Sequence, residues 1–163
     1  MERTELARLL GVGRSAGAPR DVVIEESRPD RFMRVFGEAV AAGGTVLVTD
    51  PAWGAVERAQ VPGLERKAGS EIRDLDVEHG WLGLPTGGSS GALRWARHDQ
   101  DTVAAAVRGG CGHFAVSRVN AVGVLPLHHV SGLMGWMRCA LTGGCYLPWE
   151  WSDLEAGRWP QLA

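Results

Sequence analysis

The stretch PDRFMRVFGEAVAAGGTVLVTD, Pro29 to Asp50, contains a helix pattern followed directly by a strand pattern. Its first half places apolar side chains at helical spacing, at Phe32, Val35, Phe36, Ala39 and Val40. Pro29 is typical of a helix start and Gly43 of a helix end. The run Thr45–Asp50 is β-branched and apolar, and Pro51 ends it. A helix that leads straight into a buried strand is typical of an α/β fold.

The same alternation continues on both sides of this unit. Further strands are predicted at Arg20–Ser27, Trp81–Pro85, Ala92–His98, Val119–Leu127 and Cys145–Trp149. We expect residues 51–78 to be loop with irregular helix. The sequence therefore predicts an α/β fold with a largely parallel sheet flanked by helices. Ligands of such folds gather at the carboxyl ends of strands, where Thr86 and His128 are expected.

Two more helices are predicted in the second half of the chain. Asp99 is a suitable cap for a helix through Arg108, with Gly109 as its end. The segment VSGLMGWMRCALTGG then places four apolar side chains on one helical face, at Leu133, Met134, Met137 and Leu141.

Composition limits the classes of function. The 163 residues are enough for one domain, and the net charge of −2 without a basic run disfavours a nucleic-acid partner. The most apolar stretch, residues 120–137, is interrupted by a proline and two histidines, so no membrane span is expected. The N-terminus lacks the apolar core of a signal peptide. Three cysteines without CxxC spacing predict neither a disulfide framework nor a zinc site, and we expect a cytoplasmic protein.

The stretch LPTGGSSGALRWARH, Leu84 to His98, is the first candidate site. Glycines without a Cβ allow several backbone N–H groups to face one anion, and hydroxyls add donors. The candidate phosphate ligands are Thr86, Gly87, Gly88, Ser89, Ser90, Gly91 and Arg94. The pattern is neither a Walker A motif nor GxGxxG.

Two other interpretations of this stretch remain open. It is compatible with a plain flexible hairpin, because glycine punctuates loops everywhere. Gly87–Gly91 also fits the G-x-S-x-G nucleophile elbow of hydrolases, with Ser89 as nucleophile. An elbow should lead straight into a helix, whereas the residues that follow alternate like a strand. The hydrolase interpretation is therefore disfavoured.

A second candidate site is LPLHHVSGLMGWM, which places His128 and His129 at a predicted helix start. A helix N-terminus favours an anionic ligand and disfavours a charged imidazole, so a neutral hydrogen-bonding histidine fits there. A structural role for at least one histidine is the simpler alternative. No carboxylate or cysteine lies at metal-ligand spacing, so no metal site is predicted. Trp136 is expected in the core.

Together the two stretches resemble the adenylate-forming acyl-CoA ligase superfamily, whose phosphate loop reads Thr-Ser-Gly-Thr-Thr-Gly-x-Pro-Lys-Gly. Thr86, Gly88 and Gly91 match it, and Ser89 and Ser90 replace its threonines. Gly87, Leu93 and Arg94 stand where the family has serine, proline and lysine. The family's Pro-Leu-Phe-His-x-x-Gly motif is matched from Pro126, with His128 in the phenylalanine position. The variant Leu-Pro-Leu-His-His-Val-Ser-Gly-Leu-Met looks most like o-succinylbenzoate–CoA ligases of menaquinone and phylloquinone synthesis.

The resemblance implies a two-step reaction. ATP, with Mg²⁺, activates a small-molecule carboxylate as an acyl-adenylate, and coenzyme A then displaces AMP to give a thioester. The segment Thr86–Gly91 with Arg94 would hold the β- and γ-phosphates. His129 would be the catalytic residue near the acyl carboxylate, and His128, Ser131 and Gly132 would line the substrate pocket.

The resemblance covers residues 81–149, and residues 1–80 add a compatible α/β lead-in. Members of the family are more than twice as long, so residues 1–163 are expected to form one partial AMP-binding domain without the C-terminal lid domain. We expect that this chain alone does not complete the reaction. A non-catalytic binding or regulatory remnant of the ligase fold is the other alternative. We also expect it to self-associate or to bind a C-terminal partner chain.

Overall fold

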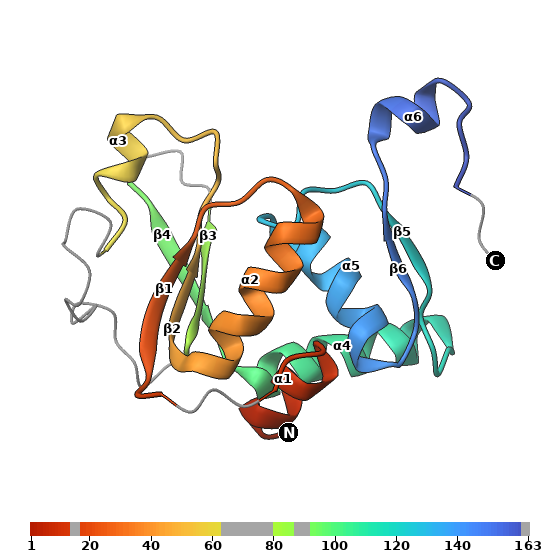
Figure 1. Cartoon of the computed structure of the whole chain (residues 1–163). Helices are drawn as coiled ribbons and strands as arrows, with labels where there is room; N and C mark the ends of the chain where they lie inside the picture. Colours follow the sequence, from red (N-terminus) through yellow and green to blue (C-terminus); the bar gives the residue numbers. More distant parts are fainter. Residues whose placement is uncertain (14–16, 63–79, 87–91, 161–163) are drawn as a thin grey trace.

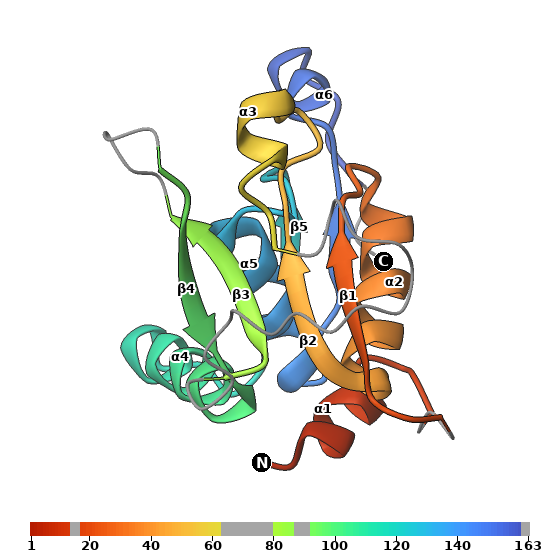
Figure 2. The same cartoon turned by 90° about the vertical axis from the view of Figure 1, so that its left-hand side faces the viewer.

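Strands β1 (Arg20–Ile24), β2 (Gly43–Val48), β3 (Leu82–Thr86) and β4 (Arg94–His98) form one sheet in this order. The computed structural model describes residues 1–13, 17–62, 80–86 and 92–160. β1, β2 and β3 are parallel, and β4 is antiparallel to β3. The carboxyl ends of the three parallel strands therefore lie at one edge of the sheet (Figure 2). The predicted α/β fold with a largely parallel sheet is confirmed.

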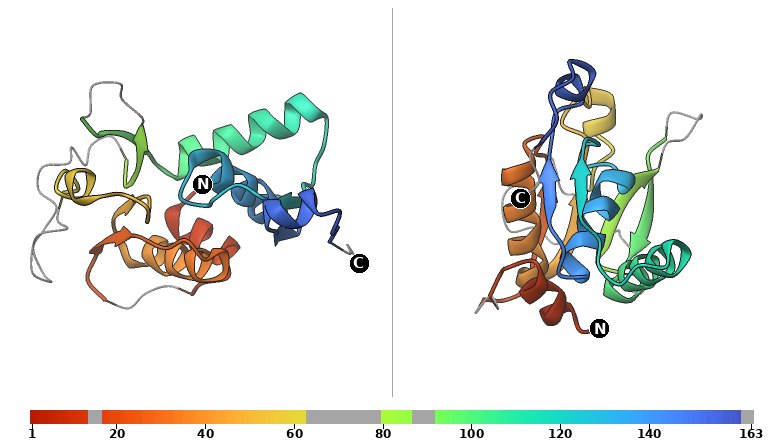
Figure 3. Two further views of the ribbon diagram at one scale, coloured as in Figure 1. Left: turned by 90° about the horizontal axis from the view of Figure 1, so that it is seen from above. Right: turned by 90° about the vertical axis from the view of Figure 1, so that its right-hand side faces the viewer.

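Two helices fill the middle of the molecule. α2 (Pro29–Ala42) connects β1 to β2, and α5 (Val130–Leu141) connects β5 (Ala121–Gly123) to β6 (Tyr146–Pro148). β5 and β6 form a separate parallel pair. α2 and α5 lie between the two sheets (Figure 1), and Figure 3 shows the same ribbon from above and from the side of β5 and β6. α2 follows the predicted limits, because its C-cap Gly43 adopts the left-handed backbone with φ of 80°.

The core is built where α2, α5 and the larger sheet meet. Phe36 is 1% exposed, and its ring lies 6.5 Å from that of Trp81 and 5.6 Å from that of Trp136. Trp136 is thus a core residue, as predicted. Other fully buried members are Phe32, Val46, Leu82, Leu133 and Met137. Burial of apolar surface stabilises a fold by about 25 cal/mol per Å², so these large buried side chains contribute most of the hydrophobic free energy that holds α2, α5 and the sheet together.

The remaining helices lie at the periphery. They are α1 (Arg3–Leu9), α3 (Ala55–Arg58), α4 (Gln100–Phe114) and α6 (Trp151–Glu155). Arg3 of α1 donates hydrogen bonds to the carbonyl oxygens of Ala39, Val40 and Gly44, and its guanidinium stacks on Trp81 at 4.1 Å. These contacts satisfy carbonyls at the end of α2 and fix α1 below the sheet. No helix in the described part of the chain is long and apolar enough to cross a bilayer.

Two predicted boundaries and one feature of the sheet are wrong. α4 does not stop at Gly109 but continues to Phe114, although each glycine in this extension costs about 1 kcal/mol relative to alanine. Cys111, beyond Gly109, packs against the hydrophobic core, and this tertiary contact favours the longer helix. The predicted strand Val119–Leu127 shrinks to β5, since the chain turns toward α5 directly after it. The strands also divide between two sheets rather than joining one.

The cap of α4 gives a test of this local structure. The Asp99 carboxylate accepts hydrogen bonds from the N–H groups of Asp101 and Thr102, and the Thr102 hydroxyl accepts from the Asp99 N–H. We expect Asp99→Ala to lower the free energy of unfolding by about 1 kcal/mol at neutral pH, measured by urea denaturation. Asp99→Ser, which keeps a capping oxygen, should lose much less, and an equal loss in both variants would contradict the cap.

The same cap predicts a pH dependence. The hydrogen bond from the Thr102 N–H is the main cause that lowers the pKa of Asp99 below 3.8. A carboxyl whose pKa is lowered by folding stabilises the protein above the unfolded pKa and loses that contribution as the pH falls through the folded pKa. The difference in unfolding free energy between wild type and Asp99→Ala should therefore shrink below about pH 4.

Candidate functional site

The glycine stretch joins two antiparallel strands. Thr86 ends β3 and Arg94 begins β4, and these two residues are paired across the hairpin. The Thr86 hydroxyl donates to the Arg94 carbonyl oxygen at 3.3 Å, and both residues are exposed. Gly87, Gly88, Ser89, Ser90 and Gly91 lie outside the described residues. The structure therefore places the two ends of the predicted phosphate loop side by side, at the carboxyl end of a parallel strand.

Contacts with the segment around α3 hold the base of this hairpin. The Leu93 N–H donates to the Gln60 side-chain oxygen at 2.8 Å. Trp95 packs edge-on against Trp53 with ring centroids 6.4 Å apart. The Arg94 guanidinium makes no hydrogen bond or ion pair with the described residues, and it is thus a free cation beside the Thr86 hydroxyl. A guanidinium can pair with phosphate oxygens, and the Thr86 hydroxyl could donate to them by turning away from the Arg94 carbonyl.

The two histidines lie at the start of α5. His129 is the N-cap residue and is exposed, and its side chain does not cap the helix. The His128 side chain is only 10% exposed, and its Nε2 lies 3.5 Å from Asp50 Oδ1. His128 Nδ1 is buried and has no hydrogen-bond partner among the described residues. The His128 and His129 rings have centroids 4.6 Å apart.

Asp50 is the residue that sequence reasoning missed. It lies two residues after the end of β2, and its Oδ1 accepts a hydrogen bond from the Ala52 N–H at 2.8 Å, which closes a turn. Its position after a buried parallel strand was the available signal, because such positions share the ligand-binding edge of the sheet. One donor atom each from Asp50, His128 and His129 lies within 4.8 Å of the other two. A carboxylate therefore lies beside the two histidines in space, although none lies at metal-ligand spacing in the sequence.

Electrostatics at this cluster favour a neutral His128. Burial is the main cause that lowers the pKa of His128, and the neighbouring His129 lowers it further. The Asp50 carboxylate acts in the opposite direction. The net effect is a pKa below the usual value of 6.5, so the ring is predominantly uncharged at neutral pH. A neutral imidazole has a free lone pair for a proton or a metal ion.

A cavity of about 320 Å³ connects the two candidate stretches. Its walls are formed by Pro85, Leu125, Pro126, His128, His129, Val130 and Ser131. Pro85 is the β3 residue that precedes Thr86, whereas the other residues belong to the loop and first turn of α5. Segments far apart in the sequence therefore meet in one hollow. Gly132 is buried behind this wall, packed against the backbone of Pro126.

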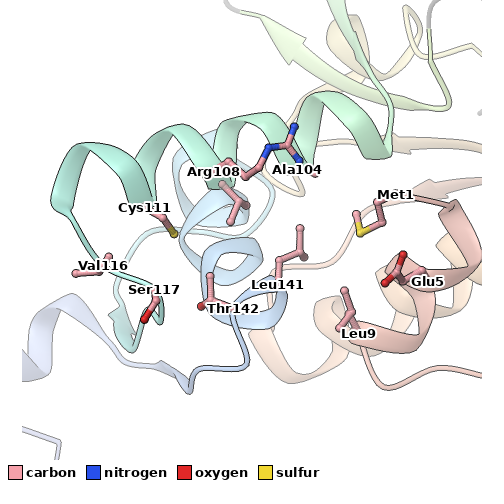
Figure 4. Close-up of a pocket in the computed structure, with 11 residues that line it drawn as sticks. Met1, Glu5, Leu9, Ala104, Arg108, Cys111, Val116, Ser117, Leu141 and Thr142 are labelled. Atoms are coloured by element: carbon pink, nitrogen blue, oxygen red, sulfur yellow. The ribbon is translucent and has the colours of Figure 1, made fainter.

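A larger cavity of about 390 Å³ lies elsewhere, between α1, α4 and the end of α5 (Figure 4). Leu9, Cys111 and Leu141 approach it from these three helices, with Glu5 and Arg108 among its polar groups. It contains no residue of either candidate stretch. We therefore place the candidate site at the smaller cavity, where the residues with relevant chemistry converge.

No family model matches this chain, and no curated protein matches it either. Among solved structures it is similar to the o-succinylbenzoate–coenzyme A synthetase of Bacillus subtilis in complex with ATP and a magnesium ion. The TM-score is 0.56 and the sequence identity is 12%, over 95% of this chain and 51% of that chain. The chain shares the fold of part of that synthetase. It spans about half the length of the matched structure, and a likeness at this identity shows the fold alone.

The packing of Gly132 predicts a strict size limit within α5. A Cβ added at Gly132 would overlap the Pro126 carbonyl oxygen and lie 2.7 Å from that of Leu125, and neither backbone atom can move aside cheaply. We expect Gly132→Ala to reduce the free energy of unfolding by about 1–3 kcal/mol or more in thermal or urea denaturation.

Gly135→Ala in the same helix is the matched control. An added Cβ there meets only Tyr146, at an ordinary 3.8 Å. This variant should gain helix propensity, up to about 1 kcal/mol. Equal effects of the two substitutions would show that the contact with the Pro126 backbone does not govern the position of α5.

Burial of His128 predicts a loss of stability in weak acid. A histidine whose pKa is lowered by folding takes up its proton more readily in the unfolded chain. Stability should therefore be complete above about pH 6.5 and fall as the pH drops from there through the lower folded pKa. We expect His128→Phe to flatten the dependence of Tm on pH over this interval. An identical pH profile for wild type and variant would contradict the role of His128.

Proposed function

We propose that this chain binds the ATP phosphates and the substrate carboxylate in an ATP-dependent carboxylate–CoA ligase. The ligase reaction would proceed through an acyl-adenylate. The observation that carries the proposal is the 320 Å³ cavity, which brings the end of β3 and the histidine motif together. In the sequence these are the two stretches that resemble the ligase superfamily. The fold likeness to a synthetase solved with ATP and magnesium supports the same assignment.

The end of the β3–β4 hairpin, between Thr86 and Arg94, would bind the β- and γ-phosphates of ATP. Thr86 offers a hydroxyl and Arg94 an unpaired guanidinium, on adjacent strands. Gly87–Gly91 would add backbone N–H donors between them. Such donors stabilise the charge that develops on pyrophosphate as it leaves. Magnesium would accompany the ATP and neutralise part of that charge when bound.

The histidine motif would bind the carboxylate substrate. His129 is exposed at the cavity and can donate a hydrogen bond to a carboxylate at the N-terminal end of α5. His128 and Ser131 line the same cavity. We propose o-succinylbenzoate as the substrate and coenzyme A as the acyl acceptor, since the motif resembles that of o-succinylbenzoate–CoA ligases. Gly132 acts from behind this wall as a packing residue.

The remaining half of such a ligase would have to complete the reaction. Adenine and coenzyme A contacts, and the closing lid, would come from a further segment, a partner chain or a second copy. Exposed apolar side chains near the smaller sheet, Trp151 and Trp159, are 58% and 72% exposed and offer a surface for it. Closure over preorganised groups is what such catalysis requires.

The serine hydrolase alternative is weaker. A nucleophile elbow places its serine on a sharp turn between a strand and a helix. Here the residues after Gly87–Gly91 form the strand β4, which returns antiparallel to β3. The geometry on both sides of Ser89 is that of a hairpin, so a nucleophile there would lack the helix that an elbow needs.

Nucleotide binding by the 163-residue chain tests the proposal. We expect ATP to bind weakly in isothermal titration calorimetry, and Arg94→Ala to weaken binding roughly tenfold or more, because a charge-assisted hydrogen bond contributes about 1.5–3 kcal/mol. Arg34→Ala, which removes an exposed arginine of α2, is the matched control and should leave ATP affinity unchanged.

Three results would contradict the assignment. The first is an absence of ATP binding at millimolar nucleotide, and the second is equal weakening of ATP binding by both arginine variants. The third is covalent labelling of Ser89 by a fluorophosphonate, which would favour the hydrolase. With the full enzyme, ATP–pyrophosphate exchange that depends on o-succinylbenzoate would establish the substrate.

A further inference from the structure

Three side chains with metal-ligating atoms converge at the carboxyl edge of the larger sheet. Asp50 lies two residues after the end of β2, and His128 and His129 come from the residues before α5. One donor atom from each lies within 4.8 Å of the other two. Two imidazole nitrogens and one carboxylate oxygen form a donor set that suits Zn²⁺ and related transition metals.

The spacing of the closest pair agrees with shared coordination. His128 Nε2 and Asp50 Oδ1 are 3.5 Å apart, which is long for a hydrogen bond between a ring nitrogen and a carboxylate. Two atoms that each lie about 2.0–2.1 Å from one tetrahedral ion are roughly 3.4 Å apart. The pair is thus separated by about the distance that two ligands of one ion adopt.

The candidate ligand atoms are also not fully used in hydrogen bonds with the described residues, so they have lone pairs available for an ion. The His128 side chain is nine-tenths buried; its Nδ1 has no hydrogen-bond partner among the described residues, and its Nε2 has only the 3.5 Å contact with Asp50. Buried polar atoms without a partner are uncommon and often mark a site for an ion or a water molecule. Asp50 uses one lone pair of its Oδ1 for the Ala52 N–H, and the rest of the carboxylate remains available.

We propose that Asp50, His128 and His129 bind one divalent transition-metal ion of the Zn²⁺ class. Three protein ligands leave at least one coordination position for water or an anion, as in catalytic rather than structural zinc sites. Both histidines line the 320 Å³ cavity, so the ion would border the space into which a small ligand fits. The site shares His128 and His129 with the proposed carboxylate pocket, but its assignment does not rest on the ligase function. It differs from the magnesium that accompanies ATP, since Mg²⁺ prefers oxygen ligands.

Metal titration of the purified chain tests the site without any assay of activity. We expect Co²⁺ to bind with one ion per chain and to give visible d–d absorption, and Zn²⁺ to displace it and to raise Tm. Mg²⁺ should not displace Co²⁺. No Co²⁺ binding at millimolar concentration, or displacement by equimolar Mg²⁺, would overturn the proposal.

Single substitutions locate the ligands. Asp50→Asn keeps an oxygen for the Ala52 N–H but removes the charge, and His129→Gln changes an exposed side chain, so both should fold. Each should weaken Co²⁺ binding roughly tenfold or more. His113→Gln, at an exposed histidine of α4, is the matched control and should have no effect. Unchanged Co²⁺ affinity in the first two variants, or an equal loss of affinity in the control, would show that Co²⁺ binds elsewhere on the protein surface and would overturn the proposed site.

Histidine ring NMR of the wild-type chain gives a second test that requires no variant. Zn²⁺ should shift the ring nitrogen resonances of His128 and His129 together, at one equivalent, and leave those of His98 and His113 in place. Shifts confined to His98 or His113, or spread evenly over all these rings, would overturn the proposal.

Discussion

The site depends on the packing of one side chain, Phe36. Its ring contacts Trp81, which precedes β3, and Trp136, which lies in the middle of α5. Because α2 is thereby fixed against both elements, the start of α5 cannot move far from the carboxyl end of β3. Truncation of such a buried aromatic residue typically costs about 3–5 kcal/mol. The cavity between the two candidate stretches is therefore a consequence of the core.

The central part of the fold was predictable from sequence because its signals are local. The helical spacing from Phe32 to Val40, followed by a glycine with left-handed backbone, fixes α2, and the β-rich run after Gly43 fixes β2. The Asp99 cap was likewise readable. The end of α4 was not, because Gly109 weakens a helix locally while Cys111, beyond it, packs against the hydrophobic core. Local propensity cannot show how much packing will outweigh it.

The candidate site was predictable only in part, for the same reason. The proposal of a phosphate site at the hairpin rests on residue types that are adjacent in sequence. The pairing of Thr86 with Arg94 follows once β3 and β4 are antiparallel. The approach of Asp50 to His128 depends instead on the order of β2 and β3 in the sheet and on the position of α5. These are long-range properties that no spacing of residues in the chain encodes. Strands were predicted where β5 and β6 lie, but their separation into a second sheet was not, because strand pairing is also a long-range property.

The pairing of His128 with Asp50 gives a physical reason for one departure from the ligase pattern. A phenylalanine at position 128 would place an apolar ring against a half-buried carboxylate, and burying a charge beside an apolar surface is costly. An imidazole instead gives Asp50 a polar neighbour, and it makes that wall of the cavity polar. Under the proposed function, a polar wall beside the acyl carboxylate favours a substrate with a second polar group over a plain hydrocarbon acid. Within that proposal, the uncharged His128 ring would be the hydrogen-bond donor to such a group, because the Asp50 carboxylate repels a second carboxylate.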